Sequence, residues 1–234
     1  MTENPGPSGR SVFLIGAAGG VGRPLAAILT ARGARVTGLH RSPEQAERIA
    51  TTGAAPVAGD LISDTAEQLA ARMAGHDAVV FSAGAHGTGP DQTTAIDGDG
   101  LVKAAEAARS CGIRRFVLVS VFMDAGRGAA RSEGFEHYMA VKRRADVALA
   151  ATELDWLIIR PGTLLNDAGT GRVSAGPAIA YGSVPRADVA AFIAEALFDD
   201  QLNRTTIELT TGDTPVADAV LALHPRPVGA LHTT

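Results

Sequence analysis

The chain is poor in the residues that mark several classes of protein. It has one cysteine, Cys111, so no intrachain disulfide can form, and this favours a reducing, cytoplasmic setting. The histidines have none of the spacings of a metal site, so we expect no metal. No apolar run reaches the roughly 18 residues of a membrane helix, so we expect no membrane partner.

The chain also lacks a large excess of charge of either sign. The 234 residues carry a formal net charge of -4, and no basic stripe is visible along the chain. Proteins whose main partner is a nucleic acid present such a stripe. We therefore expect a small-molecule substrate and no nucleic acid. The oligomeric state has no signature in the sequence.

What the chain has is a regular alternation of two patterns. Apolar, β-branched runs predict strands, and alanine-rich stretches of helical period predict helices. The predicted strands are Val12–Ile15, Arg35–Leu39, Ala54–Ala58, Ala78–Ser82, Arg115–Ser120 and Asp155–Arg160. The predicted helices between them are Val21–Ala31, Pro43–Thr51, Asp64–Met73, Thr93–Ser110 and Arg131–Ala151. This order predicts a Rossmann-like α/β fold: a doubly wound parallel sheet in a three-layer α/β/α arrangement with a small C-terminal cap.

The domain organisation follows from where this alternation begins and ends. Residues 1–10 are predicted to be a disordered leader, 11–225 a single dinucleotide-binding domain, and 226–234 a frayed tail. Within the domain, 161–225 are predicted to form a substrate-side loop and the C-terminal cap. The Gly-, Ala-, Thr- and Ser-rich stretch 161–183 is the loop, followed by a helix from Arg186 to Phe198 and a strand over Thr205–Thr210.

Three glycines at a fixed interval end the first predicted strand. Gly16 suits a sharp turn, Gly19 lets backbone amides approach a diphosphate, and Gly22 lets the next helix pack closely. The helix start then offers free N–H groups to an anion. A bare structural turn also uses glycine, but this one lies inside a βαβ unit. We expect the coenzyme contacts here to be Gly16, Ala18, Gly19, Gly20, Val21 and Gly22.

The second predicted strand ends without the carboxylate that NAD-binding chains place there. Leu39, His40 and Arg41 occupy the position. A guanidinium matches a 2′-phosphate in charge and geometry. The sequence therefore predicts NADP(H), with NAD(H) possible; the alternative for Arg41 is a solvated loop cation.

Two further strand ends complete the predicted coenzyme site. Asp60, followed by Leu61, either accepts from the adenine amino group or caps the next helix. Ser82, Ala83 and Gly84 are small, which leaves room for the coenzyme beside the fourth strand.

With these motifs the chain resembles the atypical and extended short-chain dehydrogenases/reductases, in the branch of small NAD(P)H-binding proteins. Besides Arg41, the matching pieces are GAAGGVG (16–22), GDL (59–61), FSAGA (81–85), GIRRFVLVS (112–120), YMAVK (138–142), WLIIRPG (156–162) and VPRADVA (184–190). They span residues 11 to 200 and are specific for the fold. They are less specific for a reaction, because the branch includes reductases, epimerases and cofactor sensors.

Tyr138 and Lys142 are the candidate catalytic pair. Four residues apart on a predicted helix, they share a face, and a nearby ammonium lowers the pKa of a tyrosine. The pair would give a proton to a carbonyl oxygen or take one from an alcohol. An amphipathic surface helix can produce the same spacing by chance. Ser120, at the end of the fifth strand, would orient the substrate oxygen.

The resemblance adds further expectations. It implies that Lys142 also holds the nicotinamide ribose and that Pro161 and Gly162 lie near the nicotinamide amide. Arg186 and Asp188 resemble the family's Arg-x-Asp, with Asp188 a helix N-terminal charge or a substrate contact. Val121 and Phe122 follow Ser120 where many extended members carry further hydroxyls.

These observations predict an NADP(H)-dependent oxidoreductase that acts on a small carbonyl, quinone or related acceptor. One alternative is an epimerase or dehydratase that retains its coenzyme, although only about 70 residues follow Arg160. The other is a non-catalytic module that senses the NADP redox state. The sequence does not identify the substrate.

Overall fold

A nine-stranded sheet forms the middle layer of the molecule. The computed structural model describes residues 8–85, 87–126 and 132–225. Over these residues the strand order is β11-β8-β10-β6-β5-β4-β1-β2-β3. The parallel strands are β1 (Ser11–Ile15), β2 (Arg35–His40), β3 (Ala55–Ala58), β4 (Ala78–Phe81), β5 (Arg115–Val119), β6 (Asp155–Pro161) and β10 (Thr205–Thr211). Two more strands extend the sheet beyond β10: β8 (Arg172–Gly176) pairs antiparallel with β10, and β11 (Thr214–Pro215) pairs antiparallel with β8.

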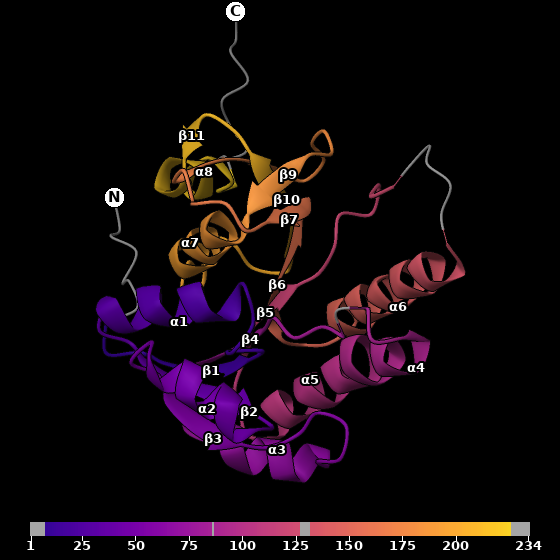
Figure 1. Ribbon diagram of the computed structural model, residues 1–234. Coiled ribbons are helices and arrows are strands. Elements are labelled where there is room, and N and C mark those ends of the chain that lie inside the picture. The colour runs from indigo at the N-terminus through magenta and orange to yellow at the C-terminus, as the bar shows by residue number, and fades with distance from the viewer. Residues whose placement is uncertain (1–7, 86, 127–131, 226–234) are drawn as a thin grey trace, which may run out of the picture.

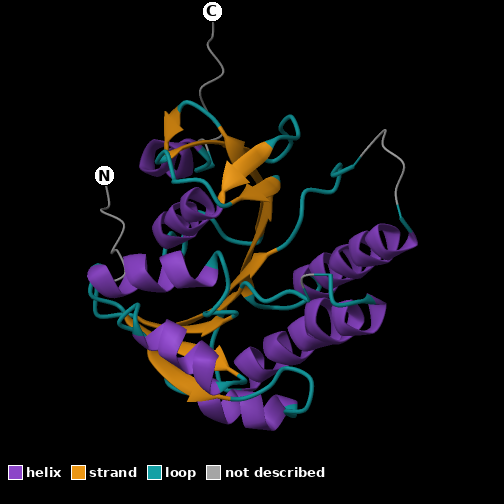
Figure 2. Cartoon of the chain, in the orientation of Figure 1, coloured by secondary structure: helices purple, strands orange, loops and turns teal. Residues whose placement is uncertain are grey.

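Helices cover both faces of this sheet (Figures 1 and 2). One face carries α1 (Gly22–Ala31), α2 (Pro43–Ala50), α7 (Arg186–Ala196) and α8 (Val216–Ala222). The other carries α3 (Ala66–Met73), α5 (Gly100–Ser110) and α6 (Glu133–Ala150), with the short α4 (Pro90–Thr93) and a π-helix, η1 (Thr94–Asp99), before α5. The predicted three-layer, doubly wound α/β fold is therefore confirmed.

The first strand shows why its residues are apolar without interruption. Val12 and Leu14 pack into the hydrophobic cluster under α1 and α7, whereas Phe13 and Ile15 pack into the cluster under α3 and α5. A strand that is covered on both faces needs apolar side chains on both. From β1 the chain builds β2 and β3 on one side of the sheet and then crosses back to place β4 on the other side of β1. The carboxyl ends of β1 and β4 therefore form the switch point where ligands bind in such sheets.

The predicted loop over 161–183 is wrong as a description of backbone structure. Besides β8, the segment contains β7 (Thr163–Leu165), and β9 (Ser183–Pro185) begins at its last residue; β7 and β9 pair in parallel as a separate two-stranded sheet. These strands are short, and their pairing partners lie in β10, in β11 and in each other. Local composition does not reveal such pairing. The predicted late strand is confirmed as β10.

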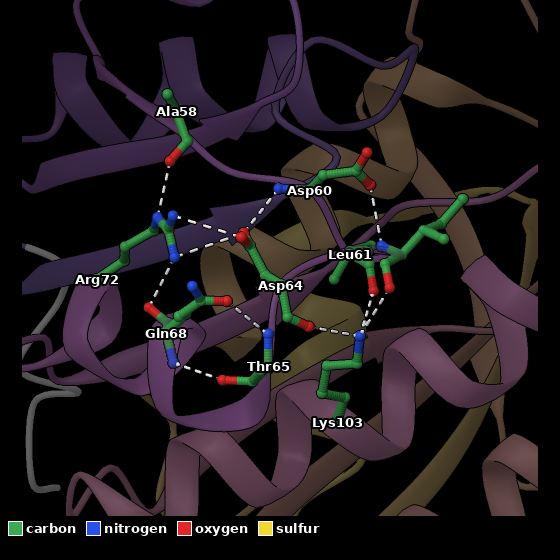
Figure 3. Close-up of polar contacts among 9 residues, drawn as sticks. Ala58, Asp60, Leu61, Asp64, Thr65, Gln68, Arg72 and Lys103 are labelled. Atoms are coloured by element: carbon green, nitrogen blue, oxygen red, sulfur yellow. Dashed lines mark hydrogen bonds and ion pairs between the residues drawn. The ribbon is translucent and has the colours of Figure 1, made fainter.

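Side-chain caps begin α2 and α3. Ser42 caps α2, and its side chain accepts from the N–H of Gln45. Thr65 caps α3, where Thr65 and Gln68 form the reciprocal capping box (Figure 3). Asp64 pairs with Arg72.

Part of the predicted N-terminal leader packs against the fold. Gly9 and Arg10, placed in the leader by the sequence reading, contact the fold: Gly9 N–H donates to Gly33, and the Arg10 guanidinium lies over the Phe198 ring. Residues 1–7 and the predicted tail 226–234 lie outside the described residues. Among the described helices, none combines the length and apolar character that crossing a membrane requires.

Candidate coenzyme and active site

The glycines after β1 are required by close backbone contacts. Gly16 has φ +86, and a Cβ on it would lie 2.6 Å from the backbone N of Ala83. A Cβ on Gly22 would lie 2.2 Å from the carbonyl oxygen of Gly16. Gly16 therefore makes the sharp turn, as predicted, and Gly22 brings the start of α1 against the turn itself. The helix begins at Gly22.

The first cavity lies at the carboxyl ends of β1, β2 and β4 and has a volume of about 420 Å³. Its lining brings together predicted coenzyme contacts from four separate segments. They are Gly16, Ala18, Gly19, Arg41, Asp60, Leu61, Ser82, Ala83 and Gly84. Arg48 of α2 also lines it, and neither this guanidinium nor that of Arg41 is held by a salt bridge to a described carboxylate. Two cations thus face the end of β2, where the sequence predicted one.

Asp60 does not cap α3. Its carboxylate accepts from the N–H of Ile62, and its own N–H donates to Asp64 (Figure 3). Lys103, from α5, donates to the carbonyls of Leu61, Ile62 and Asp64 and fixes the loop from the other side. This network holds Asp60 at the wall of the first cavity, and the capping of α3 is left to Thr65.

The second cavity, of about 530 Å³, adjoins the first, and the two share residues 82–85 as lining. Ser120 follows β5, and Tyr138 and Lys142 project from α6; all three line this cavity. Gly20, Val21, Asp97, Leu164 and Arg186 line it as well. The structure therefore brings together the three residues that sequence reasoning proposed as catalytic.

Lys142 is a buried cation with a buried partner. Its side chain is 3% exposed, and its Nζ lies 3.5 Å from Oδ1 of Asp97, which is 2% exposed. Nζ also donates to the carbonyl of Val119, and the other Asp97 oxygen accepts from the N–H of Ala85. The π-helix η1 carries Asp97 to this position. Lys142 is thus neutralised by a carboxylate that the sequence did not single out.

Tyr138 differs from the sequence expectation in its pKa. Burial raises the pKa of Tyr138 to about 12, with further contributions from the Asp97 and Asp146 carboxylates. The expected lowering by Lys142 is wrong for the chain as it stands, because the ammonium charge is compensated by Asp97. The phenol is therefore protonated at neutral pH, and its hydroxyl makes no hydrogen bond to another described residue. It faces the cavity as a proton donor.

Ser120 is oriented by a second buried carboxylate. Its hydroxyl donates to Oδ1 of Asp146 at 2.5 Å, and Oδ2 of Asp146 accepts from Nε of Arg160 at 2.9 Å. Asp146 is 3% exposed, and burial raises the pKa of its carboxyl. Tyr138, Lys142 and Asp146 recur every four residues and so form one stripe of α6. Because the hydroxyl hydrogen of Ser120 is used in the hydrogen bond to Asp146, the Ser120 oxygen can act toward the cavity only as a hydrogen-bond acceptor.

Some predicted site residues are not brought to either cavity. Pro161 ends β6 beside β10, and a Cβ on Gly162 would lie 2.2 Å from the carbonyl oxygen of Gly182, so both have packing roles. Gly22 also supports the glycine turn without lining a cavity. Asp188 is buried and accepts from the N–H groups of Thr170 and Gly171, which makes it a loop anchor.

Sequence reasoning missed Arg48, Asp97 and Asp146. Arg48 could have been found from its spacing in the sequence. It lies one helical turn beyond Gln45, whose side-chain oxygen accepts from the N–H of Arg41. Asp146 likewise continues the spacing of Tyr138 and Lys142. Asp97 had no such signal, because its position depends on the π-helix. Within the described residues, no group of three or more His, Cys, Asp or Glu side chains is arranged to hold a metal ion.

A protein family and several known proteins match this chain. The sequence pattern of a family described as NAD(P)H-binding matches residues 16–200. An uncharacterized sugar epimerase, YhfK of Bacillus subtilis, is 38% identical over 214 residues, which cover 91% of this chain and 99% of the relative.

Two solved structures extend the likeness to the whole fold. A Bacillus halodurans protein, provisionally named an NAD-dependent epimerase/dehydratase, is 35% identical with a TM-score of 0.84 over 92% of this chain and 100% of its own. The oxidoreductase YlbE of Lactococcus lactis is 26% identical with a TM-score of 0.80, over 92% and 99% of the two chains. The chain belongs to the NAD(P)H-binding family, in an atypical branch of the short-chain dehydrogenases/reductases.

Proposed function

We propose that this protein is an NADPH-dependent reductase of a small carbonyl, quinone or related acceptor. The observation that carries the proposal is the protonated Tyr138 hydroxyl in the lining of the second cavity, which shares a wall of small residues with the first. A group that holds its proton at neutral pH is suited to give one to an oxygen that gains electrons.

The residues present fit a phosphorylated dinucleotide. The turn at Gly16 and Gly22 is closed by main-chain contacts and places the backbone of Gly19 and Gly20 in the lining of the two cavities, which is the kind of surface a diphosphate approaches. Arg41 and Arg48 supply positive charge at the end of β2 for a 2′-phosphate. Lys142 keeps an N–H that has no acceptor among the described residues and that would hold the nicotinamide ribose.

The chain's own part in the reaction is proton transfer and positioning. A bound reduced nicotinamide supplies a hydride. As the acceptor carbon gains the hydride, its oxygen takes the phenolic proton of Tyr138, and solvent later returns a proton to the phenolate. Ser120 accepts a hydrogen bond from the hydroxyl of the product and so fixes its orientation. The Lys142–Asp97 pair adds no net charge to the cavity.

The test is NADPH oxidation against a panel of carbonyl and quinone acceptors, with wild type compared with Tyr138→Phe. We expect the variant to lose about 100-fold or more in kcat, because general acid catalysis contributes about that much, and to bind NADPH as wild type does. Tyr181→Phe is the matched control, since Tyr181 is exposed and lines neither cavity. Unchanged turnover in Tyr138→Phe would remove Tyr138 from the mechanism.

The names of the relatives favour a second candidate, an epimerase or dehydratase. Such an enzyme first oxidises its substrate, and Tyr138 would then have to act as a base. A pKa of about 12 leaves little phenolate at neutral pH, which supports reduction as the first choice. Coenzyme that co-purifies with the protein and is not consumed during turnover would favour the epimerase.

A further inference from the structure

Arg186, the first residue of α7, lies across the glycine-rich turn. A Cβ built on Gly20 would be 2.5 Å from Cδ of Arg186 and 2.8 Å from its Nε. The side chain therefore covers the open face of Gly20, at the end of the turn that leads into α1. Since α1 and α7 pack against each other on the same face of the sheet, this placement follows from the fold (Figure 1).

The charge of Arg186 is not compensated by a described carboxylate. Its Nη1 donates to the carbonyl of Leu164 at 3.0 Å and to Oδ1 of Asn166 at 2.7 Å, and both acceptors are neutral. The Nε–H and Nη2 donors have no acceptor among the described residues. The other charged side chains that line the second cavity, Lys142 and Asp97, neutralise each other. Arg186 thus leaves one net positive charge at the cavity wall.

The backbone beneath the guanidinium also presents unused donors. The N–H groups of Gly20, Val21 and Gly22 have no acceptor within the described part of the chain. Helix α1 has no acidic residue in its first turn and no side-chain cap. Gly20 and Val21 line the second cavity together with Arg186, so unused backbone donors and a planar guanidinium share one wall, and that combination suits a doubly charged phosphate group.

We propose that Arg186 binds the diphosphate of the coenzyme against Gly20 and, through Leu164 and Asn166, connects the bound coenzyme to the end of β7. The proposal rests on the coenzyme assignment of the proposed function. Arg186 then links the glycine-rich turn to the segment that lines the substrate side of the second cavity. Arg186 thereby becomes a coenzyme-binding residue.

Titration calorimetry with three ligands tests this role. NADPH and 2′-phospho-ADP-ribose contain the diphosphate, whereas adenosine 2′-phosphate lacks it. In Arg186→Gln we expect the affinity for the first two to fall about 10- to 100-fold, as the loss of charge-assisted hydrogen bonds predicts. The affinity for adenosine 2′-phosphate, measured by displacement, stays within about twofold because Arg186 lines the second cavity, whereas Arg41 lines the first.

Arg186→Lys is the second variant and keeps the charge without the planar fork. We expect an intermediate loss, and thermal unfolding of both variants checks that they are folded. Unchanged binding of 2′-phospho-ADP-ribose to folded Arg186→Gln overturns the proposal, and a raised acceptor KM would then place Arg186 on the substrate. If wild type binds neither NADPH nor NADH, the proposed function fails as well.

Discussion

The two cavities are built from different kinds of residue. The first is lined by backbone glycines and by cations at the protein surface, Arg41 and Arg48, which have no described salt-bridge partner. The second is lined by the buried Asp97, and the buried Asp146 accepts a hydrogen bond from the lining residue Ser120; each carboxylate is paired with a cation from another element. Charge is thus left available for a ligand in the first cavity and is almost entirely balanced within the protein in the second. The exception in the second cavity is Arg186.

This difference has an energetic meaning. An exposed cation is solvated by water at little cost in free energy, so it needs no partner in the protein and stays available to an anionic ligand. A buried charge without a partner is strongly destabilising, so the paired charges of Lys142, Asp97 and Asp146 are tied to the stability of the fold. Substitutions of these paired charges should therefore affect folding, whereas substitutions of Arg41 and Arg48 should affect binding.

The largest effect is expected at Lys142. Lys142→Met leaves Asp97 buried without its cation and should lower the free energy of unfolding by about 3–5 kcal/mol. Urea unfolding at neutral pH measures the change. The double variant Asp97→Leu/Lys142→Met should recover part of the loss, because it removes both charges. A loss below about 1 kcal/mol in Lys142→Met would mean that the pair is not needed for stability.

A smaller effect is expected at the surface of the first cavity. Arg41→Ala and Arg48→Ala should each weaken NADPH binding by about 1.5–3 kcal/mol, the range for hydrogen bonds to charged groups. Binding of NADH, which lacks the 2′-phosphate, should change little, and the free energy of unfolding should stay within about 0.5 kcal/mol.

Arg109→Ala is the matched control for these variants, because Arg109 is an exposed arginine in the last turn of α5 and lines neither cavity. Calorimetric titration with both coenzymes distinguishes the outcomes. Equal weakening of NADPH and NADH in the Arg41 and Arg48 variants would contradict a 2′-phosphate site at the end of β2.

The smallest effect concerns pH and is expected to be nearly absent. Reduction needs the protonated form of Tyr138, which is present below its pKa and is lost as the pH rises through it. With a pKa of about 12, Tyr138 should produce no basic limb in the pH profile of kcat across the range from neutral to about pH 10. Stopped-flow or steady-state NADPH oxidation across this range provides the measurement. A limb near neutral pH that disappears in Tyr138→Phe would show that the pKa is lowered in the complex.

Features that depend on neighbouring residues could be predicted from the sequence, whereas features that depend on distant residues could not. The glycine turn, the order of strands and helices up to Arg160, and the alignment of Tyr138 with Lys142 are local patterns, and the structure has them as predicted. The strands within 161–183 were missed, because β8 is stabilised by pairing with β10, more than thirty residues away in the chain. The lowered pKa expected for Tyr138 was wrong for a similar reason, since that pKa depends first on burial in the folded chain and then on the Asp97 carboxylate from another helix.

By itself, the sequence determined the parallel sheet and the bare backbone turn at its switch point, because hydrophobic periodicity and glycine conformation act over a few residues. Only the tertiary structure decided which charges remain available to a ligand. That outcome depends on Asp97 reaching Lys142 through a π-helix, on Asp146 lying between Ser120 and Arg160, and on α7 carrying Arg186 across Gly20. These partners are distant in sequence, and the strength of a charge interaction depends on burial and distance in the folded chain.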